Sequence, residues 1–263
     1  MRFFVPRFPL LFVMGKGMKN IIIYLALAMS VIVFLPDCPA GAGGFTADTV
    51  GKVLRATVTI YVYDQTGKQI AQGSGFFFKE YGHLITNYHV LGKAFAARVK
   101  TFDGREFNVE SIVAEDKRDD VVEALVDMVY GSAPYLIPAA ASSGPGDPLL
   151  VAGSPLGVAR VTSRGKVIQI AVIPELGKCI VHDAHAAHGS SGGPVVNPEG
   201  EVIGMETAGL VGRPNVDFAI PVERFSGLTS CYRELETLKA LRRSNAASGV
   251  EVKSSNIHSS NIQ

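Results

Sequence analysis

Residues 189–196 read GSSGGPVV, a serine between glycines on a turn that runs into an apolar strand. A nucleophilic serine needs an exposed hydroxyl and nearby backbone N–H groups that converge on one point, and glycines permit such a backbone. We therefore predict that Ser191 is a nucleophile. The amides of Gly189, Ser190 and Ser191 would form an oxyanion hole, in which each donor contributes roughly 3 kcal/mol. A plain Gly/Ser turn is the alternative, because so short a string also occurs by chance.

Two further segments supply the partners that such a serine requires. Residues 84–90 (LITNYHV) predict a strand that leads to His89, a candidate general base, although a histidine after a strand is often structural. In residues 116–122 (DKRDDVV), Asp120 directly precedes a short apolar strand and is the preferred candidate for the carboxylate that orients the imidazole, with Asp119 as the alternative. The chain order His, Asp, Ser matches chymotrypsin-type enzymes rather than subtilisins or α/β-hydrolases.

The rest of the chain predicts an all-β body. From Ala56 onward, short β-branched or aromatic runs alternate with turn residues, and no stretch of helical period occurs before Pro221. Residues 139–148 (AAASSGPGDP) are typical of a linker between two groups of about six strands. Two small barrels are therefore expected, and a pair of immunoglobulin-like sandwiches is the competing fold. Strands are expected at residues 57–62, 73–79, 83–86, 97–101, 149–152, 159–162, 166–172, 179–182, 193–196, 202–207 and 216–220.

Several motifs in order resemble the HtrA/Deg group of trypsin-like proteases. GSGF at residues 73–76 is followed by TNYHV at 86–90, and similar segments occur at 151–157, 197–207 and 216–221, so that the resemblance covers about residues 50–225. It implies a trypsin/chymotrypsin-like double six-stranded antiparallel β-barrel. It also implies a serine endopeptidase that hydrolyses extended or unfolded polypeptides through an acyl-enzyme and needs no cofactor or metal. A catalytically silent peptide-binding protein is the main alternative, and an esterase is a weaker one.

The sequence departs from the family pattern near the predicted nucleophile. Residues 182–188 read HDAHAAH where the family usually shows TDAAINP. His185 falls where trypsin-like enzymes line the pocket for the residue before the scissile bond, and it either selects polar or acidic side chains or points away. Three histidines at intervals of three also invite a metal-site interpretation, which an extended loop disfavours. By the resemblance, Glu206, Thr207 and Ala208 belong to the strand that pairs with substrate, and the charge of Glu206 is unusual there.

The N-terminal residues predict export. Residues 21–35 (IIIYLALAMSVIVFL) carry no charge, follow Lys16 and Lys19, and precede small residues that end at Ala42. This layout is typical of a signal peptide over residues 1–42 and is shorter than the about 20 residues of a membrane span. We therefore expect a secreted or periplasmic protein without a stable membrane span. The formal net charge of +1 gives no indication of a nucleic-acid partner.

The expected domains are an N-terminal barrel at residues 43–140, a C-terminal barrel at 141–225, a helix at 226–243 and a disordered tail at 244–263. The helix is predicted because apolar residues from Phe225 to Leu241 recur at spacings of three and four. Too few residues follow Arg242 for a PDZ domain, and homo-oligomer formation is left open. Cys179 and Cys231 either pair or remain thiols.

Overall fold

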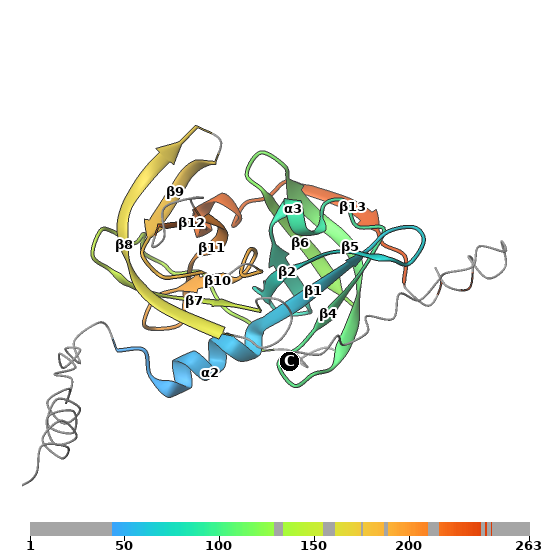
Figure 1. The fold of residues 1–263 in the computed structure, drawn as a ribbon, viewed down its shortest axis with the longest axis horizontal. Coiled ribbons are helices and arrows are strands. Elements are labelled where there is room, and N and C mark those ends of the chain that lie inside the picture. Colours follow the sequence, from blue (N-terminus) through green and yellow to red (C-terminus); the bar gives the residue numbers. More distant parts are fainter. Residues whose placement is uncertain are drawn as a thin grey trace, which may run out of the picture. The chain divides into compact units, whose positions relative to one another are not determined.

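Antiparallel strands are the main regular elements of the described residues in the computed structural model, as Figure 1 shows. The structure describes residues 44–128, 134–154, 161–174, 176–186, 189–209 and 216–237, together with Ala240 and Arg243. These residues belong to one unit, Gly43–Gln263. The predicted signal peptide and the predicted tail lie outside the described residues. Within the described ranges, no helix has the length and hydropathy that a membrane crossing requires.

A helix that the sequence analysis missed precedes the first strand. Helix α2 (Ala47–Ala56) begins after Thr46, whose Oγ1 accepts a hydrogen bond from the Thr49 N–H at 3.0 Å. Val53 and Ala56 are fully buried on one side of the helix. The predicted elements begin at Ala56, so α2 lies in a part of the chain for which no element was predicted. A threonine cap and apolar residues three positions apart are the signals that mark this helix.

The N-terminal barrel is closed by six strands. The strands follow the order β5-β4-β1-β2-β3-β6, and β5 also pairs with β6 to close the sheet. The short helix α3 (Tyr88–Leu91) follows β3. The bounds are β1 (Thr57–Tyr63), β2 (Gln69–Phe77), β3 (His83–Thr86), β4 (Ala96–Lys100), β5 (Glu106–Asp116) and β6 (Val121–Val126).

The C-terminal barrel is closed in the order β10-β11-β12-β9-β8-β7. Its bounds are β7 (Pro148–Gly153), β8 (Val161–Ile173), β9 (Gly177–His182), β10 (Pro194–Val196), β11 (Val202–Gly209) and β12 (Asp217–Pro221). The prediction of two closed six-stranded barrels is thus confirmed. The two strands predicted within residues 159–172 are one long strand, β8, which pairs with β7 through its first half and with β9 through its second half.

The barrels share a hydrophobic core at their junction. This cluster combines Val53 of α2, Ile85 of the first barrel and Met205 of the second barrel, all fully buried. Phe225 follows the 3₁₀ helix η2 (Val222–Arg224), and its ring lies 5.4 Å from that of Phe78. Because burial of apolar area stabilises by about 25 cal/mol per Å², this shared core fixes the two barrels against each other.

The segment predicted as a C-terminal helix, residues 226–243, contains a strand, and among its described residues only Ala240 and Arg243 are helical. Strand β13 (Ser230–Glu234) pairs antiparallel with β5 on the first barrel instead of packing as a helix on the second. The helical prediction is therefore wrong for these residues. The predicted helical spacing depends on Tyr232, which is exposed. The pairs between β4 and β5 end at Asn108, and pairing with the edge of β5 beyond them outweighs the weak helical preference of a short segment.

Candidate active site

His89 and Asp120 are brought together by adjacent loops of the first barrel. His89 lies in α3, directly after β3, and Asp120 ends the turn between β5 and β6. His89 Nδ1 lies 2.8 Å from Asp120 Oδ2, and the His89 backbone N–H donates to Oδ1 at 2.9 Å. A carboxylate in this position favours the tautomer with the proton on Nδ1, which leaves Nε2 available as a base.

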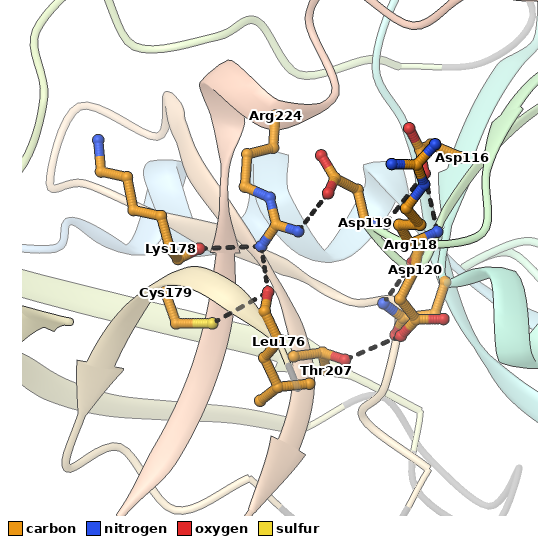
Figure 2. Close-up of polar contacts among 10 residues, drawn as sticks. Asp116, Arg118, Asp119, Asp120, Leu176, Lys178, Cys179, Thr207 and Arg224 are labelled. Atoms are coloured by element: carbon orange, nitrogen blue, oxygen red, sulfur yellow. Dashed lines mark hydrogen bonds and ion pairs between the residues drawn. The ribbon is translucent and has the colours of Figure 1, made fainter. Parts of the chain in front are cut away.

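The choice between the two adjacent carboxylates is clear in the structure. Asp120 contacts His89, whereas Asp119 Oδ1 accepts a hydrogen bond from Arg224 at 2.5 Å (Figure 2). Asp120 has a positive φ of 54°, a conformation that aspartate tolerates better than most residues. The Asp120 carbonyl accepts from the Tyr88 N–H at 3.0 Å, so that the backbone as well as the side chain joins this turn to α3.

The turn that carries Ser191 depends on its glycines. Gly189 and Gly192 have φ values of 97° and 86°, which favour glycine. A Cβ on Gly192 would overlap the carbonyl oxygen of Ser74. The Gly193 N–H donates to the Ser190 carbonyl at 2.8 Å and closes the turn. The turn therefore needs glycine at position 192, as the sequence predicts, because a side chain there would displace the backbone.

Ser74 of the GSGF motif fastens this turn from the other barrel. Its N–H donates to the Ser191 carbonyl at 2.9 Å, and its hydroxyl donates to the Gly189 carbonyl at 2.6 Å. The Ser154 N–H in turn donates to Ser74 Oγ at 2.9 Å. Within the described ranges, the amides of Gly189 and Ser191 donate to no other residue, as an oxyanion hole requires.

Comparison with known proteins agrees with this geometry. The family model of the trypsin-like peptidase domain matches residues 73–205. The chain belongs to this family. Serine protease HTRA1 of Xenopus tropicalis is 30% identical over 203 residues, covering 72% of this chain and 43% of that protein. Serine protease HTRA3 of Rattus norvegicus is 29% identical over 211 residues, covering 72% of this chain and 45% of that protein. The chain thus spans less than half the length of these relatives.

A solved structure supports the fold of this trypsin-like peptidase domain. The serine endoprotease from Yersinia pestis superposes with a TM-score of 0.61 at 24% sequence identity, covering 68% of this chain and 62% of that chain. The likeness concerns the two-barrel architecture described above.

The Ser191 hydroxyl of this trypsin-like domain is hydrogen-bonded to the backbone of the second barrel. It donates to the Thr207 carbonyl at 3.1 Å, and no hydrogen bond joins it to His89 in this structure. Catalytic hydrogen bonds are often long in free enzymes and shorten when substrate binds. The Ser191 hydroxyl must therefore turn away from Thr207 before its proton can pass to His89.

Thr207 has a role that the sequence analysis did not find. Its hydroxyl donates to Asp120 Oδ2 at 3.0 Å (Figure 2), so that a residue predicted to line the substrate pocket also holds the carboxylate that contacts His89. Ala208 lies beside it on β11 and pairs with Phe218. The only signal for the Thr207 contact is its place in the strand after the nucleophile, which does not reveal a partner in the other barrel.

Arg224 is a second such residue. Its guanidinium donates to the carbonyls of Leu176 at 2.5 Å and Lys178 at 2.9 Å in addition to Asp119 (Figure 2). The hydrogen bond from Arg224 to Asp119 raises the pKa of the guanidinium. Since Asp119 belongs to the first barrel and the two carbonyls to the second, Arg224 joins the barrels beside Asp120.

The cleft beside His89 and Asp120 contains residues of both barrels. A cavity of about 450 Å³ lies there, and Leu176 and Ile220 of the second barrel face residues of the first across it. The residues of the first barrel in this lining are Tyr88, His89, Lys93, Lys117, Arg118, Asp119 and Asp120. The site therefore lies at the junction of the barrels. This agrees with the chain order, which puts His89 and Asp120 in the first barrel and Ser191 in the second.

Glu206 lies in the barrel interior rather than in an open pocket. Its side chain is 2% exposed, and Oε2 lies 3.0 Å from Nε2 of the fully buried His182. The pKa of Glu206 is raised to about 7, mainly by burial; the contact with His182 opposes this shift, and the nearby charge of Asp217 adds to it. The prediction that Glu206 lines the substrate pocket is therefore wrong for this structure.

The remaining site predictions are placed as follows. His185 is exposed. Among the described residues, no group of three or more His, Cys, Asp or Glu side chains could hold a metal ion, and His188 lies outside them. Cys179 is buried and Cys231 is exposed, and both are free thiols.

Proposed function

We propose that this trypsin-like domain is a serine endopeptidase. The observation that carries the proposal is the pair of contacts between Asp120 and His89, which Thr207 links to the nucleophile turn: its hydroxyl donates to Asp120 and its carbonyl accepts from the Ser191 hydroxyl. These groups supply the parts of an acyl-transfer site: an oriented base, a serine, and backbone amides that donate to no described residue.

The proposed reaction follows from the roles of these groups. Ser191 Oγ attacks the peptide carbonyl carbon while His89 Nε2 takes its proton, and Asp120 stabilises the imidazolium that forms. The amides of Gly189 and Ser191 stabilise the oxyanion. His89 then gives the proton to the leaving amine, and water hydrolyses the acyl-enzyme by the same steps in reverse.

The substrate class we propose is extended polypeptide. Strand β10 pairs with β11 only as far as Met205, and within the described residues the edge of β11 from Thr207 onward pairs with no other strand on that side. Among the described residues, the Thr207 carbonyl on this edge accepts a hydrogen bond only from the Ser191 hydroxyl. An extended chain can add to such an edge through main-chain hydrogen bonds, and a folded chain cannot.

Cleavage of unfolded casein tests the proposal. The wild type is expected to cleave, and Ser191→Ala to be inactive. Asp120→Asn and Asp119→Asn form a matched pair of adjacent carboxylates, only one of which contacts His89. Asp120→Asn should lower kcat by about 10⁴-fold, as loss of the correct tautomer does in related triads, and Asp119→Asn by far less. A folded wild type that binds casein without cutting it would instead support a silent peptide-binding protein.

We also propose that the protein acts in the cell envelope or outside the cell. The support is the predicted signal peptide over residues 1–42. N-terminal sequencing of the protein recovered from the culture medium and envelope fractions should find a start near Gly43, and a protein retained whole in the cytosol would refute export.

A further inference from the structure

Glu206 connects the nucleophile turn to the interior of the C-terminal barrel. The Gly192 N–H donates to the Glu206 carbonyl at 2.8 Å, and the Glu206 N–H donates to the Gly193 carbonyl at 2.9 Å. From the same residue, the carboxylate extends into the interior and contacts His182. Any shift of Glu206 therefore acts on the two residues that directly follow Ser191.

His182 is tied to the other end of the same turn. It is the last residue of β9, and the chain after it leads to Gly189. His182 pairs with Asp217 across β9 and β12, and Asp217 Oδ2 accepts a hydrogen bond from the Ala186 N–H at 3.2 Å. Because β12 lies between β9 and β11, the contact between His182 and Glu206 spans a strand and fixes the entry and the exit of the nucleophile turn relative to each other.

Two of the departures from the family pattern meet in this contact. His182 stands where the HtrA/Deg pattern has threonine, and Glu206 is the charge that is unusual in the strand after the nucleophile. In the structure they are each other's partner, at 0% and 2% exposure. A histidine and a carboxylate placed together in the interior form one unit, although they are far apart in the sequence.

Stability alone does not account for this unit. Burial of charged groups is costly, and apolar residues of similar size often stabilise a fold equally well or better. His182 Nδ1 is also buried without a partner among the described residues, which adds a further cost. A unit that costs stability and touches the nucleophile turn is best explained by what it does to that turn.

We propose that the buried hydrogen bond between His182 and Glu206 positions the amides of Gly189 and Ser191 for the oxyanion. Both residues are then positioning residues, and the inference rests on the endopeptidase function proposed above. Without the bond, the turn retains its sequence and its contacts with Ser74, but its amides no longer converge on one point. The expected loss lies in the chemical step, because the oxyanion forms only in the transition state.

The double variant His182→Leu/Glu206→Met of the full chain tests this proposal. It replaces both partners with apolar side chains of similar size, so the melting temperature should equal or exceed that of the wild type. We expect kcat on a fluorogenic peptide, and the rate at which a fluorophosphonate modifies Ser191, to fall at least tenfold with KM within threefold. Glu206→Gln keeps an acceptor for the His182 N–H and should lose no more than threefold.

A matched pair in the other barrel is the control. His83 Nδ1 lies 2.6 Å from Glu123 Oε1, and neither residue contacts the nucleophile turn. The variant His83→Leu/Glu123→Met should leave kcat and KM within twofold. An equal loss in both double variants, or a loss in KM alone, would show that the His182 pair is merely structural.

The outcomes separate this inference from the proposed function. If the wild type neither cleaves nor reacts with the fluorophosphonate, the endopeptidase proposal fails, and this inference fails with it. If the wild type reacts and the folded double variant reacts equally fast, only the inference is overturned. Should the double variant not fold, Glu206→Met alone is measured by the same criterion, and Glu206→Gln must still retain its activity.

Discussion

Replacement of Glu206 by glutamine should change how the stability of the protein depends on pH. Burial raises the pKa of this carboxyl from 4.5 to about 7 in the folded protein. Between these values the native state holds a proton that the unfolded chain has lost. The free energy of unfolding therefore falls as pH rises through this window, by about 1.4 kcal/mol per pH unit. The whole window corresponds to about 3 kcal/mol, present at pH 4 and lost at pH 8.

Urea unfolding at pH 4, 6 and 8 measures this contribution. Both proteins should carry Ser191→Ala to prevent self-digestion, and circular dichroism is a suitable signal because the chain has no tryptophan. Glu206→Gln cannot take up the proton, so its stability relative to the wild type should improve by about 3 kcal/mol between pH 4 and pH 8. Glu123→Gln, which alters the other His–Glu pair, serves as the control for general effects. Parallel pH profiles for Glu206→Gln and the wild type would refute the reasoning.

Two further predictions concern contacts across the barrels. Thr207→Val removes the hydroxyl that donates to Asp120 but keeps the shape of the side chain. The value of kcat/KM should therefore fall about tenfold with little change in melting temperature, and unchanged kinetics would exclude a role for this hydroxyl. Arg224→Ala should lower the free energy of unfolding by about 2 kcal/mol because it removes the hydrogen bonds to Asp119 and to the carbonyls of Leu176 and Lys178. Arg224→Lys should recover only part of this loss, and a thermal melt of Arg224→Ala equal to that of the wild type would show that these contacts do not contribute to stability.

The sequence predicted the architecture well because the relevant signals are local. Alternating β-branched runs and turn residues indicate strands wherever they occur. The backbone of the turn around Ser191 requires its glycines. Asp120 was preferred over Asp119 from its place before a strand, and the structure shows why the two differ: one contacts His89 and the other contacts Arg224.

What the sequence could not predict depends on contacts between distant segments. Glu123 is a charged residue within the otherwise apolar strand β6, and its carboxylate is paired with His83 of the neighbouring strand β3 and with Lys79 of the connection before β3. The segment around Tyr232 has helical spacing and forms a strand, because a free edge of β5 is available only in the folded barrel. Pairing of this kind follows from the register of the sheets, which local sequence does not determine.

The contacts of Ser74 make the reactive serine sensitive to the junction of the two barrels. Ser74 belongs to the first barrel and the turn it fastens belongs to the second, so neither half of the molecule contains a finished site. A small separation of the halves would release the Ser191 and Gly189 carbonyls while each barrel kept its own strands. Loss of activity on heating should then begin before either barrel melts, and a ligand or protein that pries the halves apart would inhibit the enzyme without approaching its cleft.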